Sequence, residues 1–167
     1  MTAFPSGMRL AAVGDEKRIF DFFVIAHAEN GWGDLDTKVV WDVINRACKT
    51  DGITIAIIDG PERIEALIGL HPVKAAWYNS DAYPNWHWAD LLIYVHPLHR
   101  RTRHALKLLQ FAKWWEAHVD MPVILGLLPH ERFAEKEKLF SRYGKRIGSA
   151  FLVSRYDTVL EAEKARH

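Results

Sequence analysis

The chain has 167 residues, of which 49% are hydrophobic and 26% charged, a composition typical of one globular domain and not of a disordered chain. Its 22 basic and 21 acidic residues give a net charge of +1, which argues against broad electrostatic binding to nucleic acid or to an anionic membrane. With Cys48 as its single cysteine, the chain has no internal disulfide framework and fits the reducing cytoplasm. We expect no membrane span and no signal peptide.

The first half of the chain predicts a strand, two helices and a β-hairpin. Asp15 and Thr37 stand where N-caps of the two helices are expected, and apolar residues follow each of them at helical spacing. Asp59 and Gly60 lie in the expected turn of the hairpin. The predicted elements are a strand at residues 8–13, helices at 15–28 and 37–49, and strands at 53–58 and 64–72.

The second half alternates strands with helices, after a stretch at 73–84 that fits either strand or loop. Its predicted elements are strands at residues 87–95, 122–128 and 148–155, helices at 101–118 and 131–143, and a charged tail at 157–167. The complete order is β-α-α-β-β-β-α-β-α-β. It predicts an α/β protein of the α+β type, with a central, mostly antiparallel sheet and helices on both faces, in a single domain over residues 1–167.

A short basic turn joins the strand at 87–95 to the helix that follows it. The turn contains Arg100, Arg101 and Arg103. The start of a helix presents free backbone N–H groups and the positive end of the helix dipole, so this junction is typical of an anion site, most often for phosphate. The alternative is a basic helix start on a solvated surface.

The same turn resembles the Q/R-x-x-G-x-G/A signature of the GNAT superfamily of acyl-CoA-dependent N-acyltransferases. Arg100 and Ala105 match its first and last positions, and Val95 followed by Pro97 matches the approach to it. The element order is also similar to that of the GNAT fold over nearly the whole chain. Arg103 replaces the middle glycine. Its side chain either obstructs a pyrophosphate or turns outward and contacts it. Because the turn leads into a helix, we expect an ordinary φ at this position, which arginine can adopt.

The resemblance implies acetyl-CoA as co-substrate and two groups of residues that bind it. Backbone N–H groups near Ile93 and Val95, on a fourth strand that is bulged and splayed from the fifth, would hold the thioester. The turn would hold the pyrophosphate. Its residues are Arg100, Arg101, Thr102, Arg103, His104 and Ala105.

Three residues are candidates for deprotonating the acceptor amine. The position of the usual family glutamate falls on Ala89; His87 shares its face, whereas the adjacent Asp90 needs a bulge to do so. The ordinary pKa of histidine, about 6.5, suits a base. Glu29 is expected in the loop between the first two helices, a region that lines the acceptor pocket in this superfamily. Two of them also have a structural alternative: His87 as a sheet histidine hydrogen-bonded to a neighbour, and Glu29 as part of a helix cap.

The helix at 131–143 resembles the GNAT helix whose tyrosine protonates the departing thiolate. Phe140 occupies that position here and cannot donate a proton. Tyr143, three residues later, is the substitute candidate, and an ordinary core tyrosine is the alternative.

The sequence therefore predicts an N-acetyltransferase acting on a small-molecule or macromolecular amine. We expect no metal site, because His96, His99 and His104 lack a cysteine or acidic partner at a recognised zinc spacing. Two alternatives stay open: a non-catalytic GNAT-fold module whose basic patch at residues 100–104 binds nucleic acid or another protein, or a nucleic-acid-modifying protein resembling those encoded by phages. GNAT proteins are often dimers, which leaves a homodimer open.

Overall fold

The computed structural model describes residues 3–30, 33–74, 86–126 and 133–144. Within them one mixed sheet of five strands runs in the order β1-β2-β3-β4-β5. Neighbouring strands are antiparallel except for the last pair, which is parallel. The strands are β1 (Arg9–Leu10), β2 (Thr54–Asp59), β3 (Ile64–Lys74), β4 (Trp86–Val95) and β5 (Val123–Ile124).

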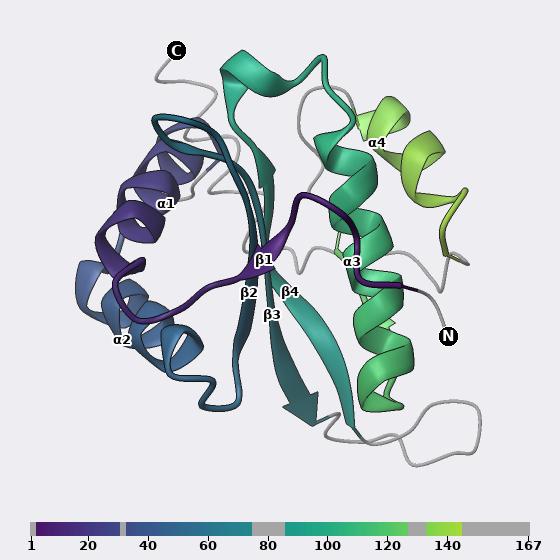
Figure 1. Cartoon of the computed structure of the whole chain (residues 1–167), viewed down its shortest axis with the longest axis horizontal. Coiled ribbons are helices and arrows are strands. Elements are labelled where there is room, and N and C mark those ends of the chain that lie inside the picture. Colours follow the sequence, from purple (N-terminus) through teal and green to yellow (C-terminus); the bar gives the residue numbers. More distant parts are fainter. Residues whose placement is uncertain (1–2, 31–32, 75–85, 127–132, 145–167) are drawn as a thin grey trace.

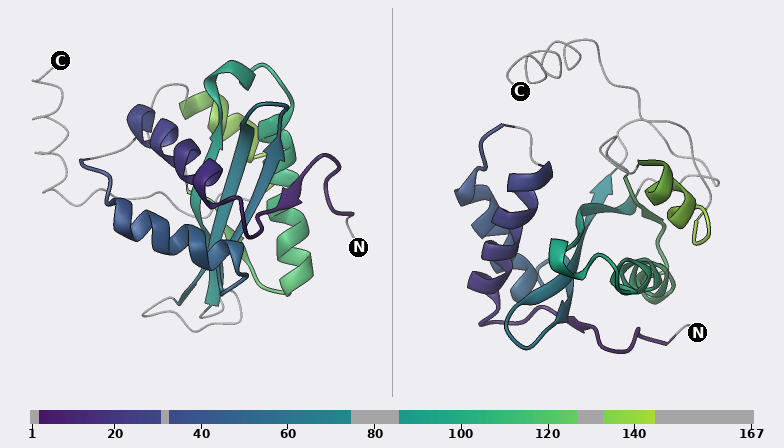
Figure 2. Two further views of the ribbon diagram at one scale, coloured as in Figure 1. Left: turned by 60° about the vertical axis from the view of Figure 1, so that its left-hand side comes forward. Right: turned by 90° about the horizontal axis from the view of Figure 1, so that it is seen from above.

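Helices cover both faces of this sheet, as the sequence predicts. On one face lie α1 (Glu16–Asn30) and α2 (Thr37–Cys48), and on the other lie α3 (His104–Val119) and α4 (Phe133–Phe140), as Figures 1 and 2 show. A short 3-10 turn, η1 (Pro97–His99), joins β4 to α3. The predicted mixed α+β architecture is therefore confirmed.

Each face of the sheet has its own apolar core, because successive strand residues point to opposite faces. Ile57 and Leu67 are fully buried beneath α1 and α2. Ile68 and Phe111 are fully buried between the sheet and α3. Burial of one such side chain stabilises the fold by about 1.5–3 kcal/mol. The site described below lies where these two layers meet at the end of β4.

Several predicted boundaries are wrong, and local hydrogen bonds explain the differences. The predicted strand at 8–13 shortens to the two residues of β1. The carboxylate of Asp15 pairs with Arg9 and accepts from the N–H of Ala12, so the chain leaves the sheet soon after β1. Asp36, not Thr37, is the N-cap of α2, since its carboxylate accepts from the N–H of Val39 at 3.1 Å.

The helix that follows the basic turn, α3, also begins later than predicted. It starts at His104 and not at 101, because η1 and a turn occupy the preceding residues. Glu29 lies in the last turn of α1 and not in a loop. Of the predicted strand at 122–128, Val123–Ile124 form β5, while residues 127 and 128 lie outside the described residues. The predicted strand at 148–155, the tail at 157–167 and most of the ambiguous stretch at 73–84 lie outside the described residues.

Two bulges interrupt the sheet near the site. Leu91 is the extra residue in β4, since Asp90 pairs with Leu70 while Leu92 pairs with Gly69. Glu65 is the extra residue in β3, since Ile64 pairs with Asp59 and the next pair joins Ala66 to Ile58. A bulge redirects the side chains beside it and increases local twist. Both bulges therefore shape the end of the sheet that leads into η1.

Candidate active site

The second half of β4 has an open edge, which we define as residues 90–95. β4 pairs with β5 only at Trp88 and Ala89, and no other described strand lies along this edge. The N–H of His96 donates to Glu65 O at 2.9 Å, so the alternating pattern turns residues 92 and 94 toward β3. The N–H groups of Ile93 and Val95 consequently point to the open edge. This is the bulged and splayed strand that the sequence analysis expects.

The basic turn lies at the end of this edge. Arg100 and Arg103 have φ values of −66° and −86°, so the arginine in place of the family glycine needs no special backbone conformation. Arg101, Thr102 and Arg103 are exposed. The Thr102 hydroxyl donates to His99 O at 2.6 Å and accepts from the N–H of His104 at 3.3 Å. The turn thus presents two exposed guanidinium groups beside the start of α3.

Arg100 points away from the helix start and toward α1. Its Nη2 donates to both carboxylate oxygens of Glu29, and the Tyr94 hydroxyl donates to the same carboxylate. The guanidinium also lies 5.7 Å from the centre of the Tyr94 ring. We call Glu29, Tyr94 and Arg100 the carboxylate network. Sequence analysis missed Tyr94, because it looks like any apolar strand residue between Ile93 and Val95.

The carboxylate network keeps Glu29 ionised. Burial opposes its ionisation, but the hydrogen bonds from Arg100 and Tyr94, with the charge of Lys136 on α4, outweigh burial and lower its pKa. Burial and the bond to Glu29 raise the pKa of Tyr94 to about 12, so the phenol keeps its proton. A carboxylate near a helix C-terminus is unfavourable, and the Arg100 guanidinium offsets this. Glu29 is therefore a fixed anion and a weak base.

Asp90 occupies the point where β4 and β5 part. Its carboxylate accepts from the N–H of Gly126 at 2.6 Å. Burial raises the pKa of this carboxyl, and the Gly126 N–H only partly opposes the shift. Asp90 lies on the α3 face, since Trp88, two residues earlier, packs in that core. Among the four residues predicted to transfer protons, Asp90 has the strongest structural case for a base.

The structure does not bring the other two candidates to these groups. His87 is half-buried and lies on the face opposite Asp90, paired with Val73. Tyr143 lies in the turn that ends α4, where its N–H donates to Phe140 O at 2.9 Å. In Figure 1, α4 lies beside the N-terminal half of α3, on the same side of the sheet as that helix.

The second residue that sequence analysis missed is an acidic one, Glu65, which contacts the histidines of the turn. Glu65 lies 2.6 Å from Nε2 of His104 and 3.6 Å from Nδ1 of His99. Because Arg100 pairs with Glu29 and His104 with Glu65, the predicted basic patch at 100–104 presents fewer free cations than its sequence suggests. Glu65 precedes His99 by more than thirty positions, so only the folded chain brings it to the turn.

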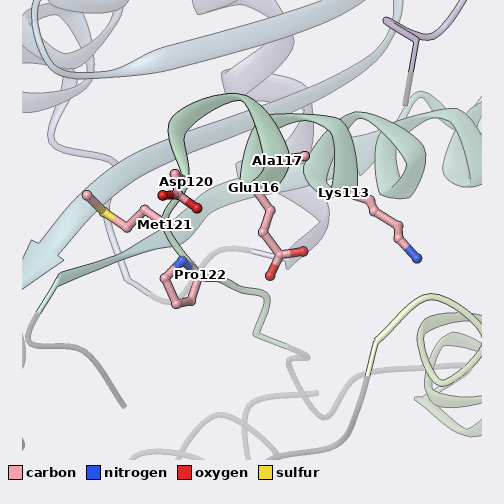
Figure 3. Close-up of a pocket in the computed structure, with 6 residues that line it drawn as sticks. All are labelled: Lys113, Glu116, Ala117, Asp120, Met121 and Pro122. Atoms are coloured by element: carbon pink, nitrogen blue, oxygen red, sulfur yellow. The ribbon is translucent and has the colours of Figure 1, made fainter. Parts of the chain in front are cut away.

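A shallow pocket lies elsewhere, at the C-terminal end of α3. Its volume is about 420 Å³, and Figure 3 shows Lys113, Glu116 and Asp120 among its lining residues. The basic turn is at the opposite end of the same helix. This pocket therefore contributes nothing to the site at the open edge.

The fold is that of the GNAT acetyltransferases. A GCN5-related N-acetyltransferase from Ralstonia eutropha JMP134 is similar with a TM-score of 0.67 and 16% identity, over 87% of this chain and 95% of that one. A predicted acetyltransferase from Clostridium acetobutylicum, solved with acetyl-CoA, has a TM-score of 0.66 and 14% identity, over 87% and 93% of the two chains. An aminoglycoside acetyltransferase from an uncultured soil metagenomic sample, in complex with sisomicin, has a TM-score of 0.61 and 8% identity, over 87% and 94%.

No protein-family model matches the sequence, and no curated protein matches it. The predicted resemblance to GNAT proteins is confirmed at the level of the fold. None of the helices in the described part of the chain combines the length and the apolar character that crossing a membrane requires.

Proposed function

We propose that the chain is a GNAT-superfamily N-acyltransferase that moves an acetyl group from acetyl-CoA to an amine. The open edge of β4 carries this proposal, because the N–H groups of Ile93 and Val95 point to it directly before the basic turn. Two aligned N–H groups suit a thioester carbonyl and the oxyanion formed from it. The structure of the same fold solved with acetyl-CoA supports the choice of co-substrate.

The turn fits the pyrophosphate of the coenzyme. The first N–H groups of a helix lack partners within the helix, and that of Ala105 is available to phosphate oxygens. Arg101 and Arg103 are exposed and add positive charge. With its ordinary φ and exposed side chain, Arg103 leaves the backbone approach open and contacts the phosphates from outside.

The carboxylate network fits the acceptor. Glu29 is ionised and half-exposed, and an ionised carboxylate offers about four acceptor positions, more than Arg100 and Tyr94 occupy. A positively charged group of the acceptor, other than the nitrogen that reacts, would bind there beside Arg100. This assigns Glu29 to binding the acceptor and leaves proton removal to another group.

Asp90 is the proposed base, and Tyr143 is the proposed acid. The Asp90 carboxylate takes a proton from the acceptor nitrogen, which attacks the thioester carbon. The Ile93 and Val95 N–H groups stabilise the oxyanion. The C–S bond then breaks, and the thiolate takes a proton, for which Tyr143 remains the predicted donor. His87 remains a prediction as a base acting through water.

Calorimetric titration with acetyl-CoA tests this proposal. We expect saturable binding that Arg101→Ala weakens, while Arg46→Ala, which removes an exposed arginine of α2, leaves it unchanged. A screen of amines for release of the coenzyme thiol then measures transfer. No binding at millimolar acetyl-CoA would reject the enzyme; salt-sensitive binding to nucleic acid in its place would favour the non-catalytic module.

A further inference from the structure

The group of Glu65, His99 and His104 has no part in the acyl-transfer chemistry. One donor atom from each side chain, a carboxylate oxygen or a ring nitrogen, lies within 4.8 Å of the other two. We propose that these three residues bind a divalent first-row transition metal, with Zn²⁺ the ion that fits best. The proposal is independent of the acyltransferase, since no coenzyme or acceptor enters it.

The distances suit a tetrahedral ion. Zn–N and Zn–O bonds of about 2.0–2.1 Å place tetrahedral ligands about 3.3 Å apart. His99 Nδ1 lies 3.6 Å from one oxygen of Glu65, and His104 Nε2 lies 2.6 Å from the other. Metal entry therefore needs a movement of about 0.7 Å between His104 and Glu65. A neutral imidazole with its proton on Nδ1 leaves the lone pair of Nε2 free for the metal, so metal binding selects this tautomer of His104.

The local fold holds the carboxylate in place. Glu65 is the bulged residue of β3, and its side chain packs over Gly60 in the hairpin turn. A Cβ at position 60 would lie 2.3 Å from Oε1 of Glu65 and 2.8 Å from its Cδ, so only glycine admits this carboxylate position. His104 is held differently. Its Nδ1 is buried with no partner in the described residues, so Glu65 alone fixes its ring by hydrogen bonding and the ring can shift toward a metal.

Burial and the types of ligand also suit a metal ion here. The side chains of His104, Glu65 and His99 are 13%, 17% and 27% exposed, which shields the donors but leaves room for solvent as a fourth ligand. Arg63 and Arg100 form their ion pairs with Glu62 and Glu29 and not with Glu65. Two imidazoles and one carboxylate select zinc, cobalt, nickel or copper over Mg²⁺, which requires oxygen ligands.

The bound ion would act as a clamp on the basic turn. His99 and His104 stand on either side of residues 100–103, and Glu65 belongs to the sheet. A metal shared by the three would tie both ends of the turn to β3. Ligand-linked stabilisation then predicts a Tm rise of about 5–10 °C at a hundredfold excess of zinc over its Kd.

The test is zinc binding by untagged protein, freed of metal by dialysis against a chelator. Competition with a chromophoric chelator gives the Kd, metal analysis gives the stoichiometry, and Co²⁺ absorption reports the geometry. We expect one ion per chain and intense tetrahedral Co²⁺ bands. Glu65→Gln, His99→Ala and His104→Ala should each weaken binding by at least about tenfold, as loss of even an outer-shell partner does.

Two exposed residues supply matched controls. His118 lies on the same helix as His104, and Glu62 lies three residues before Glu65. Their variants, His118→Ala and Glu62→Gln, should bind zinc as the parent does. His99→Ala changes a partly exposed turn residue and keeps the fold testable by circular dichroism. Absence of stoichiometric binding at micromolar zinc, or equal loss in the controls, would overturn the site.

Discussion

The contact between Glu29 and Tyr94 joins α1 to β4 and provides the sharpest test of the site geometry. Tyr94 is 7% exposed, so Glu29→Ala leaves its hydroxyl without its acceptor, at a cost of about 1–3 kcal/mol. The same change removes the ion pair with Arg100. Those two side chains are 38% and 37% exposed, which limits the pair to about 0.2–1 kcal/mol. Glu29→Ala should therefore lower the free energy of unfolding by about 1–4 kcal/mol.

The assay is a double-mutant cycle measured by urea unfolding. Tyr94→Phe removes the hydroxyl but leaves Glu29 its arginine, and should cost about 1.5–3 kcal/mol. Because both changes break one hydrogen bond, the double variant should lose less than their sum by about 1 kcal/mol or more. Asp21→Ala breaks an exposed ion pair with Lys17 on the same helix and should cost under about 0.5 kcal/mol.

The coupling should also depend on pH. The folded state lowers the pKa of Glu29, so its contribution is present above the ordinary pKa of about 4.3 and is lost as the pH falls through the folded-state value. The cycle should show coupling at about pH 7 and less in acid. Additivity within about 0.3 kcal/mol at neutral pH would refute the carboxylate network.

Three further predictions concern the proposed reaction. Arg103→Gly should weaken acetyl-CoA binding about two- to fivefold, less so at high salt, because the exposed side chain adds charge without blocking the turn; tighter binding in calorimetry would mean that it obstructs. Asp90→Asn should keep the bond from Gly126 and the affinity for acetyl-CoA while lowering kcat by at least about a hundredfold; an unchanged kcat removes Asp90 as base. Because the pKa of Asp90 is raised, the acid limb of the kcat/KM profile should lie at higher pH than for an ordinary aspartate. Tyr143→Phe should lower kcat and spare coenzyme affinity, and an equal rate in stopped assays of thiol release would reject it as the acid.

Periodicity and turn residues predicted the fold well. The apolar stripe of α3 is buried at Leu108, Leu109 and Ala112, because a helix packed on a sheet must bury one stripe. The alternation along β2 to β4 placed the hairpin and the fourth strand within a residue or two. Local capping was less predictable, since Asp15 had a stronger partner in Arg9 than in the helix start it precedes.

The site was predictable only where one segment contains it. The turn and the N–H groups of Ile93 and Val95 belong to consecutive residues, so a motif locates them. Tyr94 and Glu65 escaped prediction because their partners come from other elements. A sequence pattern also cannot reveal that the bulge at Leu91 leaves Asp90 at the parting of the strands.

Two carboxylates from distant parts of the chain contact the ends of the basic turn. Glu29 draws Arg100 toward α1, and Glu65 draws His104 toward β3, so carboxylates from both sides hold the ends of the turn. The turn enters α3 with ordinary φ values, so position 103 does not require the conformational freedom of glycine. The guanidinium of Arg103 is then left in solvent beside the helix start, where positive charge assists an anion.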